Sequence, residues 1–297
     1  MQEAPPDVPT VPRTRRGISL KEWAFIFWRT ARRAGPDQLG LIAAGIAFYA
    51  LLAVFPAIAA LTALAGLFTE ADAVVGQLQY FTQYLPDEAA LILLNQANMV
   101  AGSSDEGLSL ALALGVGIAI YMSTRATTGL LHGLNIAFQE TEARGVIVFW
   151  ATVILLTTTL LFGAVILALL LIGLPTALAF IPVDVGTEQT LAAARWILVA
   201  TVVIAGMSIL YRWGPSRSSA KWKWLTPGTL LSSLLWFLGT LGFTVYVANF
   251  GNYNQTFGSL GGVIILLTWL WLSAYIILLG ALLDSEVDRE LTDQDNV

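Results

Sequence analysis

The chain has 297 residues, of which 57% are hydrophobic and only 12% charged, with a mean hydropathy of +0.73 and a formal net charge of -5. A water-soluble surface normally carries about twice this fraction of charged residues, so the composition indicates an integral membrane protein. The chain has no cysteine, which excludes disulfides, thiolate metal sites and cysteine nucleophiles.

The N-terminal segment divides into a polar tail and an amphipathic stretch. Residues 1–18 are rich in proline and arginine and are predicted to form a disordered cytoplasmic tail. Residues 19–34 place apolar side chains such as Trp23 and Phe27 on one helix face and arginines on the other. This pattern is typical of a helix in the headgroup region of a membrane, and a helix packed on the cytoplasmic side of the protein is the alternative.

Six apolar stretches have about the 20-residue length that a membrane-spanning helix needs. They cover residues 39–67, 108–124, 147–174, 192–211, 226–249 and 259–283. Pro56 should bend the first, because proline removes one helical hydrogen bond. The pattern predicts an all-α, polytopic membrane protein with a single six-helix transmembrane domain over residues 19–285. An acidic cytoplasmic tail is expected over residues 286–297.

Two connections between these stretches also have helical patterns. Residues 70–100 contain an apolar stripe that predicts short amphipathic helices over the outer mouth of the bundle. Residues 126–139 place Leu130, Leu134 and Phe138 on one face. That second pattern predicts an interfacial amphipathic helix on the cytoplasmic side.

The basic residues alternate from one connection to the next. In a six-span arrangement, fourteen of the fifteen Lys and Arg residues fall on the side of the two termini. The connection over residues 68–107 has acidic residues and no basic one. Because basic residues collect on the cytoplasmic side of membrane proteins, both termini are predicted to be cytoplasmic.

Candidate catalytic groups are scarce in this chain. Asp, Glu, Lys and His are missing from the middle of every apolar stretch, while Arg125 and Arg195 lie near stretch ends, where long side chains reach the headgroups. The single histidine, His132, cannot by itself supply a three-ligand metal site and is read as an ordinary polar residue. Neither a phosphate-binding loop nor a nucleophile elbow occurs. The sequence therefore predicts no catalytic residue, metal, cofactor or nucleic-acid partner.

The connection before the last apolar stretch gathers Asn, aromatic and Gly residues without any charge, over residues 246–262. A tight turn explains the glycines, and a substrate-facing or gating element is the alternative. The candidate lining or gating residues are Tyr49, Pro56, Tyr246, Asn249, Tyr253 and Gly258. We hypothesise that the bend at Pro56 and this connection line one outward-facing cavity, with Tyr49, Tyr246 and Asn249 as its polar contacts.

Several motifs, in this order, resemble those of the YihY/BrkB family of inner-membrane proteins. They are residues 45–56, 134–138, 223–228, 257–262, 269–273 and 280–281. Arg125 and Asn135 are assigned to the cytoplasmic motif of that family. The family usually has an acidic residue directly after the Gly-Ala pair; here Leu282 stands in that place, and Asp284 is the nearest carboxylate.

The resemblance carries functional expectations. The family bears an old ribonuclease BN label, and its members are linked to envelope integrity, serum resistance and export of lipid or lipopolysaccharide. We therefore expect a transporter of a lipid or other amphipathic envelope molecule in the bacterial cytoplasmic (inner) membrane, with membrane lipids as partners. A membrane-bound enzyme, with the nuclease as its weakest form, and a non-transporting envelope scaffold are the alternatives, and the sequence leaves an oligomer open.

Overall fold

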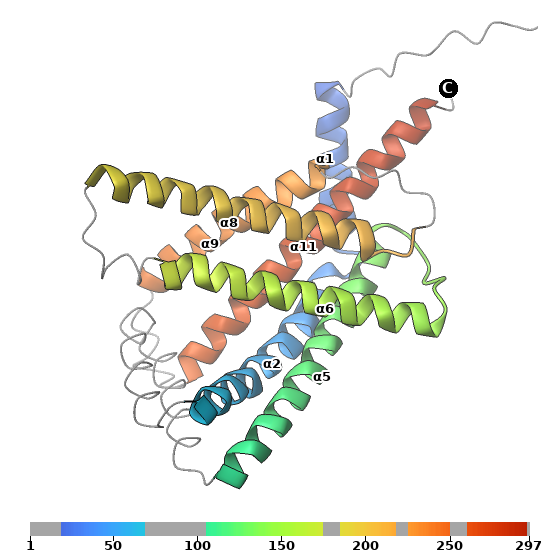
Figure 1. Cartoon of the computed structure of the whole chain (residues 1–297). Helices are drawn as coiled ribbons and strands as arrows, with labels where there is room; N and C mark the ends of the chain where they lie inside the picture. Colours follow the sequence, from blue (N-terminus) through green and yellow to red (C-terminus); the bar gives the residue numbers. More distant parts are fainter. Residues whose placement is uncertain (1–18, 69–104, 175–184, 218–224, 250–259, 296–297) are drawn as a thin grey trace, which may run out of the picture.

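The computed structural model describes residues 19–68, 105–174, 185–217, 225–249 and 260–295, and within these ranges the regular structure is helical, without a strand (Figure 1). The helices are α1 (Leu20–Ala34), α2 (Leu39–Phe68), α5 (Asp105–Ala137), α6 (Val146–Ala168) with the π-helical turn η1 (Leu169–Gly173), α8 (Val185–Trp213), α9 (Pro227–Asn249) and α11 (Leu260–Asp295). The predicted disordered tail and the predicted outer helices at residues 70–100 lie outside the described residues.

Five segments of these helices are long and apolar enough to cross a membrane. They are Leu39–Ala57, Val146–Leu171, Gln189–Trp213, Pro227–Val247 and Gly261–Thr292. Each corresponds to one of the six predicted stretches, and the remaining stretch lies within α5, which is not among the five found over the described residues. The protein is thus an all-helical, multi-pass membrane protein.

Helix α11 is the centre of the bundle. It packs against α1, α2, α5 and α9, while α6 and α8 pack against each other and against α5 and α9 respectively (Figure 1). Helices α2 and α5 run antiparallel: Tyr49 and Ile46 of α2 lie beside Arg125 and Gly129 of α5. Helix α1, the start of α2 and the end of α11 consequently meet at one end of the bundle, which we call the charged end for the side chains described below.

Close approach of α5 to its neighbours depends on Gly133. A Cβ placed on this residue would lie 2.7 Å from a methyl of Leu278 on α11 and 3.0 Å from a methyl of Ile42 on α2. The three helices therefore meet where a small residue admits two branched side chains, as in other membrane bundles. Gly133 therefore serves packing inside the protein.

Helix α1 is present where the sequence predicts it, but its docked face overlaps the predicted one only in part. Ser19 and Glu22 form a capping box that begins the helix. Ile26 is fully buried against α11, whereas Phe27 is exposed on the predicted apolar face. Trp23 of the predicted face still packs beside Ile26, so the docked face is the predicted one turned toward the arginines, to which α11 offers a carboxylate.

Two predicted boundaries differ from the structure. The expected interfacial helix at residues 126–139 is the end of α5, which is unbroken to Ala137, and Leu134 is buried in the core instead of facing an interface. No helix-breaking residue separates the two parts, and the apolar face packs on α2 and α11. Similarly, the expected tail from residue 286 belongs to α11, because Val287 packs with Ile26 of α1.

Candidate functional site

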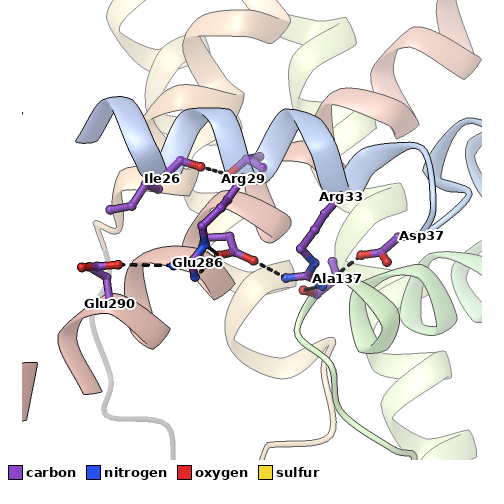
Figure 2. Close-up of polar contacts among 8 residues, drawn as sticks. Ile26, Arg29, Arg33, Asp37, Ala137, Glu286 and Glu290 are labelled. Carbon is purple, nitrogen blue, oxygen red and sulfur yellow. Dashed lines mark hydrogen bonds and ion pairs between the residues drawn. The ribbon is translucent and has the colours of Figure 1, made fainter. Parts of the chain in front are cut away.

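A cluster of charged side chains joins α1 to α11 at the charged end (Figure 2). The carboxylate of Glu286 is fully buried and accepts hydrogen bonds from Nε of Arg29 at 2.5 Å and Nη1 of Arg33 at 2.6 Å. Arg33 also donates to the carboxylate of Asp37 at 2.9 Å and to the carbonyl oxygen of Ala137 at 3.4 Å. The carboxylate of Glu286 on α11 therefore binds two arginines of α1. One of them, Arg33, also connects α1 to the end of α5.

Asp284, half a turn earlier on α11, caps the start of α9. Its buried carboxylate accepts hydrogen bonds from the backbone N–H of Gly228 at 2.6 Å and from the hydroxyl of Thr226 at 2.5 Å. The first turn of a helix has unpaired N–H groups and a positive dipole end, which favour an anion. Pro227 suits the first helical position, since its missing N–H is not needed there. The Thr-Pro-Gly motif and Asp284 are thus explained by helix capping.

Asn135 ties the connection after α5 to the end of α8. Its amide nitrogen donates to the carboxylate of Glu142 at 3.0 Å, and its amide oxygen accepts from the backbone N–H of Ser216 at 2.8 Å. Arg144 donates to the same carboxylate and to the carbonyl oxygen of Gly214. Burial would raise the pKa of Glu142, but the hydrogen bonds from Arg144 and Asn135 lower it to about 2. The carboxylate is therefore ionised at neutral pH and holds the two connections together.

Arg125 lies within α5 and not at its end. Because α5 is one helix as far as Ala137, Arg125 is about 18 Å from that end along the axis, at 1.5 Å per residue. Its guanidinium carbon lies 5.4 Å from the ring centroid of Tyr49 on α2, which is cation–π geometry. Because α5 continues for three further turns, Arg125 is not at the end of this helix, and its expected reach to the headgroups stays a prediction.

The comparison with known proteins agrees with the motifs. The family described as Virulence factor BrkB matches residues 30–296 of the chain. The chain belongs to this family. It is 30% identical over 243 residues to the ribonuclease-like protein YfkH of Bacillus subtilis, covering 80% of this chain and 86% of that protein. It is 22% identical over 278 residues to a UPF0761 membrane protein of Haemophilus influenzae, covering 92% and 97% of the two chains. No solved structure matches.

Two of the predicted lining residues of this BrkB-family protein have different neighbours. Tyr49 lies against Arg125, whereas Tyr246 on α9 is exposed and stacks with Phe243 at 6.1 Å between ring centroids. These contacts do not bring the two tyrosines together. The shared outward-facing cavity stays a prediction, because it depends on the connection after α9.

The other predicted lining residues are located only in part. Pro56 lies inside α2, which continues past it to Phe68. Asn249 is the last residue of α9. Tyr253 and Gly258 fall outside the described residues, so their proposed gating role is untested.

Sequence reasoning missed the role of Glu286 in this BrkB-family protein. The signal was present in the spacing of Leu283, Asp284 and Val287, which continues a helical pattern beyond the last apolar stretch. No residue near Glu286 in the sequence indicates its partners, because Arg29 and Arg33 lie at the other end of the chain.

Proposed function

We propose that this BrkB-family protein is a six-span transporter of a lipid or another amphipathic envelope molecule in the bacterial cytoplasmic membrane. The observation that carries the proposal is the distribution of polarity: a charged end, an apolar body, and the guanidinium of Arg125 halfway along it. Exposed apolar side chains begin within about one turn of the charged end, with Leu41 of α2 70% exposed and Ile147 of α6 86% exposed. Such a surface suits hydrocarbon tails, and Arg125 offers a partner for a polar head.

Helix α5 is the sixth span in this proposal. It lies antiparallel to α2 along a shared interface, with Gly129 facing Ile46 and Gly133 facing Ile42. Its outer surface is apolar toward the other end of the bundle, where Leu114 is exposed. Six antiparallel spans leave both termini on the same side, and the arginines of the charged end support a cytoplasmic location for that side.

The topology predicts opposite labelling of two introduced cysteines. Since the natural chain has none, Gln83→Cys and Thr141→Cys each create a single thiol. In intact cells, a membrane-impermeant maleimide should label the cysteine at position 83 and should reach that at position 141 only after the membrane is permeabilised. The reverse pattern would contradict the proposed orientation.

Transport can be tested directly in liposomes. Purified protein reconstituted with a fluorescent phospholipid should increase the fraction of label that dithionite reduces from outside, relative to protein-free liposomes, because label from the inner leaflet becomes accessible. Heat-denatured protein in the same liposomes is the control for leakage. Equal bleaching with and without folded protein would refute phospholipid movement and favour the scaffold alternative.

We further propose that the chain is not a nuclease, although its Bacillus relative is named ribonuclease-like. The buried acids of the charged end already have partners: Asp284 caps α9, and Glu286 pairs with two arginines. The fold thus employs them in holding helices together. Purified protein is expected to leave RNA intact with or without added Mg²⁺.

A further inference from the structure

We propose that one exposed face of α5 binds the anionic, phosphate-bearing headgroup of a phospholipid. The face carries Tyr121, Arg125, Thr128 and His132, which we call the α5 polar strip. This inference rests on the proposed function, and it adds the class of substrate and the place where its head is held.

The four side chains share one side of the helix. Their spacing of four, three and four residues places them in line, since residues three and four apart are neighbours on a helix surface. Tyr121, Arg125 and His132 are exposed, and Thr128 is partly exposed. The opposite side of α5 is packed in the protein, where Thr127, Leu130 and Leu131 are buried. The strip therefore runs along the outside of the bundle from mid-depth to the charged end.

The surroundings of the strip are apolar. On the adjacent helix α2, Phe48 and Leu41 are exposed, and on α5 beyond Tyr121 the exposed side chains are Ile118 and Leu114. A phospholipid could lay its tails on these surfaces while its head stays on the strip. Free phosphate has no hydrocarbon part to contact these apolar side chains, so the observations favour a lipid as the source of the phosphate.

Arg125 supplies the charge complementarity. A cation inside the hydrocarbon region is costly, and such residues usually face a polar path or an opposite charge. The ring of Tyr49 holds the guanidinium from one side. A guanidinium presents paired N–H donors that match phosphate oxygens, and the hydroxyl of Tyr121 one turn away can add another donor. The geometry thus fits a phosphate with Arg125 as its main anchor.

Binding is tested with the full-length protein in detergent micelles. A fluorescent phosphatidylglycerol is titrated, and its dissociation constant is measured by anisotropy. Arg125→Gln should weaken binding about tenfold, as expected when a charge-assisted hydrogen bond is lost. The affinity of Arg125→Lys should lie between those of the wild type and Arg125→Gln, because lysine keeps the charge but not the paired donors. The matched control is Arg195→Gln on α8, which removes an arginine that also lies over an aromatic ring, that of Trp196, and should leave binding unchanged.

Three results would overturn the assignment. The first is unchanged binding by Arg125→Gln, and the second is an equal loss of affinity in Arg195→Gln. The third is displacement of the lipid by inorganic phosphate at concentrations whose ionic strength leaves lipid binding by the control variant unchanged. If Arg125→Gln does not elute as a monodisperse species, Tyr121→Phe decides instead. It removes one exposed hydroxyl and should weaken binding about threefold, and unchanged affinity would also count against the strip.

The binding test and the liposome test fail separately. Wild-type protein that binds phosphatidylglycerol through Arg125 but moves no lipid would refute the transporter and keep the site. Conversely, transport at the wild-type rate by an Arg125→Gln variant that has lost binding would keep the transporter and overturn the strip as the place where the substrate is held.

Discussion

Glu286→Gln is expected to destabilise the protein by about 3 kcal/mol, because removing one partner of a buried ion pair leaves the other charges uncompensated. In the wild-type protein the fully buried carboxylate faces both Arg29 and Arg33. The variant leaves the two guanidinium groups close together around a neutral amide. The measurement is thermal unfolding of the purified protein in detergent, followed by tryptophan fluorescence.

The control for this change is Glu290→Gln on the same helix. Glu290 pairs with Arg29 at 3.4 Å and is partly exposed, so its contribution should stay below about 1 kcal/mol. Loss of the Glu286 carboxylate should also release α1, which would appear as faster hydrogen exchange at Ile26 and its neighbours. A Glu286→Gln variant with the same unfolding temperature as the wild type would show that the cluster does not hold α1 in place.

Gly228→Ala is expected to be the most damaging methyl addition in α9. A Cβ at this position would lie 2.1 Å from the carbonyl oxygen of Gly280 and 2.6 Å from Cγ of Asp284. The α9 and α11 backbones would have to separate, and the hydrogen bonds that cap α9 would lengthen. Overpacking alone typically costs about 1–3 kcal/mol, and the weakened cap adds to this. We expect a lower unfolding temperature and a smaller monodisperse fraction in gel filtration.

Gly242→Ala on the same helix is the matched control. A Cβ there meets no heavy atom within 4 Å, so the change should be neutral or stabilising by up to about 1 kcal/mol, given the better helix propensity of alanine. Equal destabilisation by both variants would show that the close contact with Gly280 does not determine the effect.

Apolar length, the starts of several helices and charge bias were readable from the sequence because they depend on local composition. Five predicted stretches are helices of the expected kind, and α2 and α9 begin within one residue of their predicted starts. The start of α1 is also a matter of local chemistry, since Ser19 and Glu22 are three residues apart and cap each other in the structure. Each of these features is decided by neighbours in the chain or by transfer of a segment into lipid.

Only the tertiary structure decided how the polar residues are used. Glu286 looked like the start of a solvated tail, and its burial depends on two arginines about 250 residues away in the chain. Arg125 looked like the end of an apolar stretch, and its place three turns before the end of α5 depends on that helix continuing where α2 and α11 cover its apolar face. A sequence shows that a side chain is charged, but the partner that makes its burial tolerable is chosen by packing between distant segments.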